Sequence, residues 1–118
     1  MISFQEVAEW AKSLVPDLDA RVEVFRVDTE FMDDELIEVF KEEIAKQSAL
    51  MKAGAGNDNL EDIRSAAHSI KGMGGTIGLP EISVLAHEIE LLAKKNDISA
   101  CKALVAEFVV WATDFSES

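Results

Sequence analysis

His68, Lys71 and Gly72 stand at the spacings at which residues of a helix become neighbours on its surface. A cation follows the imidazole at the third position, and a residue without a side chain follows it at the fourth. A neutral imidazole is a nucleophile near pH 7, since the pKa of an unperturbed histidine is about 6.5. An imidazole beside a positive charge and open space suits a histidine that carries a phosphoryl group and meets a large partner.

A helical wheel places His68 on the solvent side of its helix. The apolar residues gather on the opposite side, namely Ile63, Ala66, Ile70, Met73 and Ile77. The side that bears His68 also carries Glu61, Arg64, Ser65, Lys71, Gly72 and Gly75. We therefore expect His68 to project into solvent from the middle of a rigid helix.

Four glycines follow the histidine, and each costs a helix about 1 kcal/mol relative to alanine. They are Gly72, Gly74, Gly75 and Gly78. Because Met73 and Ile77 stay in phase with Ile70, we expect the helix to continue to Ile77 or Gly78. Gly72 and Gly75 would then clear space beside His68, and Gly74 would allow close helix packing. The alternative is that the helix ends at Lys71-Gly72 and a glycine loop follows.

Two further residues are candidates for partner docking. Arg64 precedes His68 by one helical turn, and a plain surface charge is an equally weighted alternative for it. Leu79 lies on the same side of the helical wheel as His68. The favoured alternative is that Leu79 is a loop residue packed against the core.

The sequence lacks the residue spacings that nucleotide-binding and metal-binding motifs require. A G-x-G-x-x-G pattern begins at Gly72 but meets Ile77 at its sixth position, and no P-loop motif is present. The di-iron pattern Glu-x-x-His fails because Ser65 and Val84 stand where glutamate is needed, and Leu91 ends the H-E-x-x-H pattern. We therefore expect no nucleotide, metal or other cofactor in this chain.

The composition indicates one globular domain of 118 residues, with 48% hydrophobic residues and a formal net charge of −12. The negative charge disfavours nucleic acid and anionic membranes as partners. Cys101 is the sole cysteine, which excludes an internal disulfide, and its spacing predicts a core position. Neither a signal peptide nor a membrane-spanning run is visible, so we expect a cytoplasmic protein.

Apolar spacing and helix-ending residues predict five helices. The first covers about residues 3–15, begins with a Ser3/Glu6 capping box and is stopped by Pro16; residues 17–28 form a helical or irregular connection. The second runs from Thr29 or Asp33 to about Lys52, with Leu36, Phe40 and Ile44 as its inner stripe, joined by Ile37, Gln47 and Met51. Residues 53–57 form a loop with glycine at the helix end.

Asp58, with Glu61 three residues later, is expected to cap the third helix, which carries His68. The fourth helix begins at Pro80, and Asn96-Asp97 ends it. The fifth begins at about Ser99 and buries Cys101, Leu104, Val105, Phe108, Ala112 and Phe115. Similar lengths and short links predict an all-α fold, an up-down antiparallel four-helix bundle over about residues 28–115 with an additional N-terminal cover helix.

The run Ala67-His68-Ser69-Ile70-Lys71-Gly72, with Gly78 six residues beyond Gly72, resembles the signature of the histidine-containing phosphotransfer (HPt) domain family. Residues 28–31 with Leu36 and Phe40 resemble the family's preceding helix, and Leu85 with Ile89-Glu90 resembles its following helix. The resemblance covers roughly residues 28–115. It departs from the family at Gly74 and Gly75 and does not reach the segment before Asp28.

The resemblance implies that His68 accepts a phosphoryl group from a receiver-domain aspartyl phosphate, or from a kinase, and passes it to another receiver. Lys71 would offset the phosphate charge, and Gly72 would leave room for the partner's loops. The partners would be response-regulator receiver domains, which bring Mg²⁺ and the aspartate, and a sensor histidine kinase. The chain itself would be a monomeric phosphoryl carrier without a kinase active site.

Two alternatives remain at the level of sequence. A helical adaptor without phosphate chemistry would keep the bundle but would not need the His-x-x-Lys-Gly run. His87-Glu88-Ile89 resembles the start of the acceptor-histidine box of sensor kinases, but Glu90 and Leu91-Leu92 replace the arginine and proline that normally follow. Since His87 lies away from the apolar stripe of its helix, we expect it to be a solvent-exposed bystander.

Overall fold

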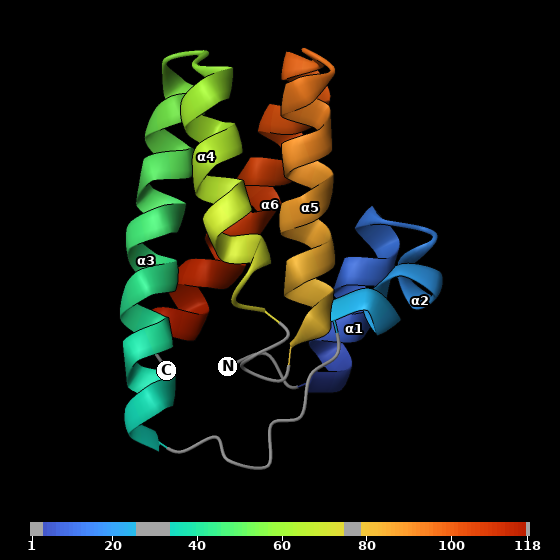
Figure 1. Ribbon diagram of the computed structural model, residues 1–118, viewed down its shortest axis with the longest axis vertical. Coiled ribbons are helices and arrows are strands. Elements are labelled where there is room, and N and C mark those ends of the chain that lie inside the picture. The colour runs from blue at the N-terminus through green and yellow to red at the C-terminus, as the bar shows by residue number, and fades with distance from the viewer. Residues whose placement is uncertain (1–3, 26–33, 75–78, 118) are drawn as a thin grey trace.

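Helices α3 to α6 form a four-helix bundle in the computed structural model, which describes residues 4–25, 34–74 and 79–117 (Figure 1). Each helix contacts the next along the chain, and α6 closes the ring against α3. Three-residue links join α3 to α4 and α5 to α6, which makes these neighbours antiparallel. The bounds are α3 Asp34–Gly56, α4 Leu60–Lys71, α5 Pro80–Lys94 and α6 Ile98–Glu117. The predicted all-α bundle is confirmed.

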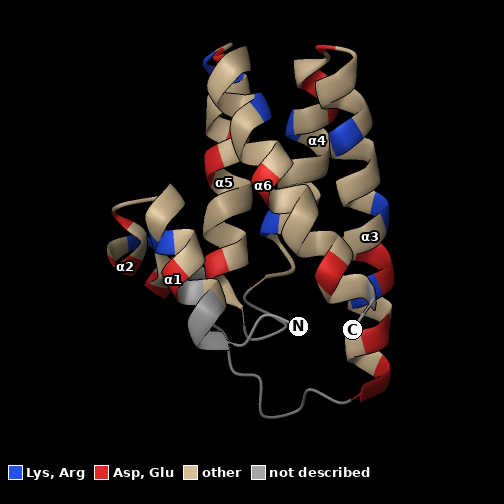
Figure 2. Ribbon diagram, turned by 180° about the vertical axis from the view of Figure 1, so that it is seen from behind, with Lys and Arg blue, Asp and Glu red and all other residues tan. Residues whose placement is uncertain are grey.

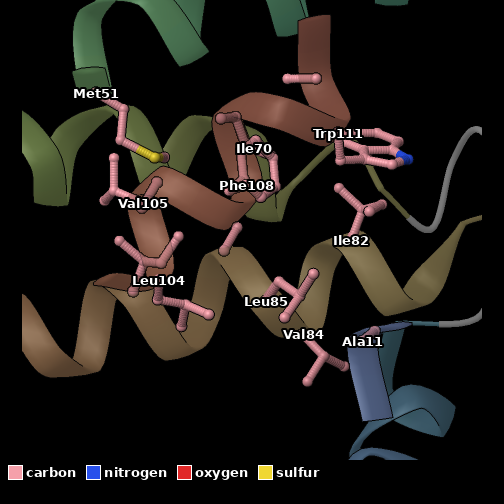
Figure 3. Close-up of a cluster of buried hydrophobic side chains, with 14 of the residues drawn as sticks. Ala11, Met51, Ile70, Ile82, Val84, Leu85, Leu104, Val105, Phe108 and Trp111 are labelled. Carbon is pink, nitrogen blue, oxygen red and sulfur yellow. The ribbon is translucent and has the colours of Figure 1, made fainter. Parts of the chain in front are cut away.

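The core lies between the four helices and receives large apolar side chains from each of them (Figure 3). Met51 of α3, Ile70 of α4, Leu85 of α5 and Phe108 of α6 are each no more than 1% exposed. Cys101 is also fully buried in α6, as its spacing predicted. Burial of this kind contributes about 1.5–3 kcal/mol per large apolar side chain, so it holds the four helices in register.

The N-terminal segment packs along α5 as α1 (Phe4–Leu14), α2 (Leu18–Arg21) and the 3-10 helix η1 (Val22–Phe25) (Figure 1). The buried side chains among those described in this segment are Val7, Ala11, Val15, Leu18 and Val22. Trp10 of α1 also stacks on Trp111 of α6, with ring centroids 6.4 Å apart. The predicted cover helix is therefore present, and the connection predicted to be helical or irregular is helical from Leu18 to Phe25. We call residues 4–25 the N-terminal cover. Residues 26–33 lie outside the described part of the chain.

The predicted loop at residues 53–57 is wrong, because α3 continues to Gly56. Gly54 faces α4 so closely that a Cβ atom would lie 3.1 Å from Ile63 Cγ1, so the glycine serves helix contact rather than a helix end. The cap of α4 is Asn59, whose side chain accepts a hydrogen bond from the backbone of Asp62, and not Asp58. Asp58 instead adopts a φ of 53° in the turn.

The inner stripe predicted for α3 holds only in part. Ile44 and Met51 are buried and Phe40 packs against the core, but Leu36 is 38% exposed. The first turns of α3 extend past the end of α4, so α4 does not pack against them (Figure 1). Acidic residues also gather on these first turns of α3 (Figure 2).

Helix α4 ends at Lys71, and Gly72, Met73 and Gly74 form a turn. The expected continuation to Ile77 or Gly78 is therefore wrong, and the alternative of a glycine turn after Lys71 holds. The physical reason is the close approach of Gly74 to the start of α5, where a Cβ would lie 2.5 Å from the backbone nitrogen of Ser83. Gly74 also accepts a hydrogen bond from the backbone of Leu79 at 2.8 Å. Residues 75–78 lie outside the described residues.

Within the described residues, no helix is both long enough and apolar enough to cross a membrane.

Candidate functional site

His68 projects from the last turn of α4, and its side chain is 63% exposed. The predicted exposure is confirmed, but the predicted position in the middle of the helix is not, because α4 ends three residues later. The buried residues of α4 lie on its other face, and they are Ile63, Ala66, Ala67 and Ile70. The carboxyl end of a helix carries partial negative charge, which favours cationic side chains in this turn.

A buried carboxylate on the neighbouring helix holds His68 in place. Glu90 of α5 is 2% exposed, and its Oε2 lies 2.8 Å from Nδ1 of His68. Its other oxygen, Oε1, accepts a hydrogen bond from Nζ of Lys71 at 2.8 Å. Glu90 therefore joins the two residues that the sequence singled out, and it does so from another helix.

The charge state of Glu90 determines which nitrogen of His68 is free. Burial alone would raise the pKa of this carboxyl group, but the hydrogen bonds from Lys71 and His68 outweigh burial and lower its pKa below 4.5. An ionised carboxylate only accepts hydrogen bonds, so Nδ1 of His68 must donate. The lone pair of the neutral ring then lies on Nε2, which is the nitrogen not bound to Glu90.

The side chain of Lys71 is held by its hydrogen bond to Glu90 and does not extend freely beside the histidine. Its side chain is 25% exposed, and its ammonium group shares the Glu90 carboxylate with His68. The positive charge thus lies one helical turn from His68 and is held there by a buried partner. This position is compatible with the predicted role beside a phosphoryl group.

Sequence reasoning missed Glu90 as a site residue, although a signal was present. Glu90 follows Ala86 by four residues and precedes Ala93 by three, and both alanines belong to the apolar stripe of α5. A glutamate on such a face is seldom buried without a partner. Its position on the wheel would have indicated a cation or a hydrogen-bond donor on a neighbouring helix.

His87 differs from the prediction of a solvent-exposed bystander, because it is half-buried on the side of α5 that meets Arg21 of the cover. Its Nδ1 lies 3.1 Å from Nη2 of Arg21, whose Nη1 pairs with Glu88 at 2.8 Å. Burial, followed by the positive charges of Arg21 and Lys71, lowers the pKa of His87 from its ordinary value of 6.5. The helical wheel did not predict the partial burial of His87, because the cover supplies a second surface that packs on α5.

The predicted docking residues have different environments. Gly72 is exposed, and among the described residues a Cβ atom there would meet only the backbone oxygen of Ser69 at 3.7 Å. Arg64 is partly exposed and pairs with Glu61 on its own helix. The docking role predicted for Leu79 is wrong, because this residue is only 6% exposed and belongs to the core. Gly75 lies outside the described residues.

The described residues include no group of three or more histidine, cysteine, aspartate or glutamate side chains placed to hold a metal ion. The site instead consists of an exposed imidazole, a buried carboxylate and a lysine. Such a set can present a ring nitrogen as a nucleophile, stabilise positive charge on the ring and offset negative charge next to it.

Comparison with protein families gave a match to the model described as the Hpt domain over residues 35–117. Comparisons with curated proteins and with solved structures gave no match. The matched region includes His68, Lys71 and Glu90 and spans nearly the whole bundle. It leaves the N-terminal cover outside.

Proposed function

This chain belongs to the Hpt domain family, and we propose on that basis that it carries a phosphoryl group on His68 between receiver domains of a phosphorelay. The observation that carries the assignment to His68 is the contrast between its exposed ring and its buried anchor. The side chain is 63% exposed, whereas the Glu90 carboxylate that binds Nδ1 is 2% exposed. A nucleophile with this support is oriented and remains accessible to a large partner.

The transfer step follows from the ring's protonation. The Nε2 lone pair of His68 attacks the phosphorus of an aspartyl phosphate, and the bond from phosphorus to the acyl oxygen breaks. The aspartate carboxylate leaves with that electron pair, while the new N–P bond places positive charge on the imidazole. Glu90 accepts a hydrogen bond from Nδ1–H and stabilises this charge, while the proton itself stays on the ring throughout.

Lys71 and Gly72 serve the phosphoryl group and the partner, respectively. The ammonium group offsets the negative charge that arrives one helical turn away, and the missing side chain at Gly72 leaves the space beside His68 open. Positioning and charge neutralisation are the main needs of phosphoryl transfer. The receiver would supply the aspartate and Mg²⁺, and a sensor histidine kinase would supply the phosphate upstream. The protein then acts as a carrier in the cytoplasm and catalyses no reaction with ATP.

Phosphate labelling tests the assignment of His68. The protein is incubated with a phosphorylated receiver domain, and the phosphate on the chain is tested for acid lability and base stability. We expect His68→Gln to abolish the label, because no other exposed imidazole is anchored in this way. His87→Gln is the matched control and should retain it. Label on the His68→Gln protein would refute the assignment, and the absence of label on the unmodified protein would favour an adaptor.

The role of Lys71 has its own test. We expect Lys71→Ala to slow transfer about tenfold, which corresponds to about 1.4 kcal/mol of lost charge stabilisation. Lys102→Ala is the matched control, since Lys102 also pairs with a carboxylate, Asp58 at 2.7 Å, but lies in α6. Rapid-quench measurement of transfer from a phosphorylated receiver gives both rates. Equal rates in the two variants would contradict the role given to Lys71.

A further inference from the structure

Arg21 links the N-terminal cover to the helix that carries Glu90. Its guanidinium group pairs with Glu88 at 2.8 Å, lies 3.1 Å from Nδ1 of His87 and approaches Asp17 at 3.5 Å. The side chain is only 20% exposed, and its contacts with Glu88 and His87 lie between α2 and α5. Arg21 therefore reaches the surroundings of the site from a segment that the family match does not include.

The contact between Arg21 and His87 specifies one form of the imidazole. A guanidinium group only donates hydrogen bonds, so Nδ1 of His87 must accept and carry a lone pair. The ring is then neutral, with its proton on Nε2. A second proton on Nδ1 would place two donors and two positive charges against each other at 3.1 Å.

His87 lies among the charges that organise the phosphorylation site. Among the described residues, the groups whose charges act on it are Arg21 of α2, Lys71 of α4, and Glu88 and Glu90 of its own helix. A charged His87 would repel Lys71 and would compete with Lys71 and His68 for the Glu90 carboxylate. An uncharged His87 leaves both oxygens of Glu90 to the partners observed in the structure.

We propose that Arg21 is a positioning residue of the phosphotransfer site, through which the N-terminal cover keeps His87 uncharged and reserves Glu90 for His68 and Lys71. This role rests on the proposed function, because it matters only where His68 transfers phosphate. The cover thus contributes a charged residue to the site in addition to covering apolar surface of α5.

Removal of Arg21 changes the environment of His87 in one direction. The variant loses a positive charge and a donor at Nδ1, and it leaves the Glu88 carboxylate without the guanidinium. Both changes favour the imidazolium, as does any added access of water. In the intact protein, burial and the charges of Arg21 and Lys71 lower the pKa of His87. Replacement of Arg21 should therefore raise the pKa of His87, so that the protonated form becomes more populated towards the acidic end of the pH range.

A double-mutant cycle tests this role through the pH profile of phosphotransfer. Rates are measured between pH 6 and pH 8 for the unmodified protein, Arg21→Met, His87→Gln and the double variant. We expect Arg21→Met to transfer about fivefold more slowly than the unmodified protein at pH 6 and at nearly the same rate at pH 8. The double variant should have the same profile as His87→Gln, because no imidazole remains at position 87 to be charged.

Lys12→Met is the matched control, since Lys12 pairs with Asp19 at 2.9 Å within the cover and forms no ion pair with α5 in the described part of the chain. Its pH profile should follow that of the unmodified protein. If Arg21→Met acted only by detaching the cover, the double variant would be as impaired as the single one. That result would overturn the proposal, as would an unchanged profile in Arg21→Met.

NMR of the imidazole rings separates this role from the proposed function. The unphosphorylated protein should show His87 with its proton on Nε2, and Arg21→Met should raise the pKa of His87. A proton on Nδ1 in the unmodified protein, or an unchanged pKa in the variant, would refute the role of Arg21. Failure of the protein to accept phosphate would refute the function of His68 instead, and it would leave this titration unaffected.

Discussion

At the scale of single residues, Glu90 provides the support that the exposed histidine needs. Its two oxygens accept from Nδ1 of His68 and Nζ of Lys71, each at 2.8 Å, and both oxygens are used. A carboxylate buried to this degree is stable in its charged form only with such partners. One residue thus sets the tautomer of the nucleophile and the position of the cation.

The variant Glu90→Gln tests whether the negative charge of Glu90, and not only a buried side chain at this position, supports His68 and Lys71. The amide has one acceptor oxygen for two donors and no charge to offset Lys71 or the phosphorylated ring. We expect transfer to slow at least tenfold and the free energy of unfolding to fall by about 1–3 kcal/mol. Urea unfolding and rapid-quench transfer measure the two effects.

Glu81→Gln is the control for Glu90→Gln, because Glu81 lies partly exposed in the first turn of the same helix. We expect it to change the free energy of unfolding by less than about 0.5 kcal/mol and the transfer rate little. Transfer by Glu90→Gln at the unmodified rate would show that Glu90 does not support His68.

At the scale of elements, the end of α4 separates two glycines that the sequence grouped together. Gly72 follows Lys71 directly, has a helical φ of −74° and is exposed. Gly74 is buried against the beginning of α5, close to Ser83 and the backbone of Leu79. The first keeps the surface beside His68 open, while the second allows α4 and α5 to approach so that Glu90 reaches His68.

Alanine substitutions distinguish the two glycines. We expect Gly74→Ala to destabilise the fold by about 2 kcal/mol or more, because the new Cβ would lie 2.5 Å from Ser83 N and 2.9 Å from Leu79 O. Gly72→Ala should leave stability unchanged or raise it by up to about 1 kcal/mol, since its backbone is helical and its Cβ has room. Thermal unfolding of both variants checks the order, and equal melting temperatures would contradict it.

At the scale of the whole molecule, the cover, α4 and α5 share one set of charges around the site. Arg21, Lys71, His87 and Glu90 come from three helices, and each alters the electrostatic environment of another. The folded state lowers the pKa of both His87 and Glu90. The unfolded chain consequently binds more protons at these groups, and both contribute stability that is lost as the pH falls.

The pH dependence of stability should reveal the His87 contribution. This contribution is fully present above the ordinary pKa of 6.5 and is lost as the pH falls through the lower pKa of the folded protein. We expect the stability difference between the unmodified protein and His87→Gln to be larger at pH 7.5 than at pH 5, because glutamine does not titrate. Urea unfolding at the two pH values measures it, and a constant difference would contradict the lowered pKa.

Much of this protein could be predicted from the order of its residues. Apolar spacing identified the bundle helices, and the contrast between His68 and the stripe around Ile70 placed the histidine on the outer face. These properties are local, since they depend on residues three and four positions apart on one helix. Helix ends were predicted less well, because Gly54 and Gly74 are placed by contacts with neighbouring helices rather than by turn formation.

The sequence by itself determined an all-helical chain in which an exposed histidine, His68, is followed by a lysine and a glycine. Only the tertiary structure decided that Glu90 binds His68, that Leu79 is buried and that Arg21 of the cover meets His87. The reason is physical, because these contacts join residues 22 and 66 positions apart in the chain. Such contacts depend on which helix faces pack together, and a single-helix pattern does not contain that information.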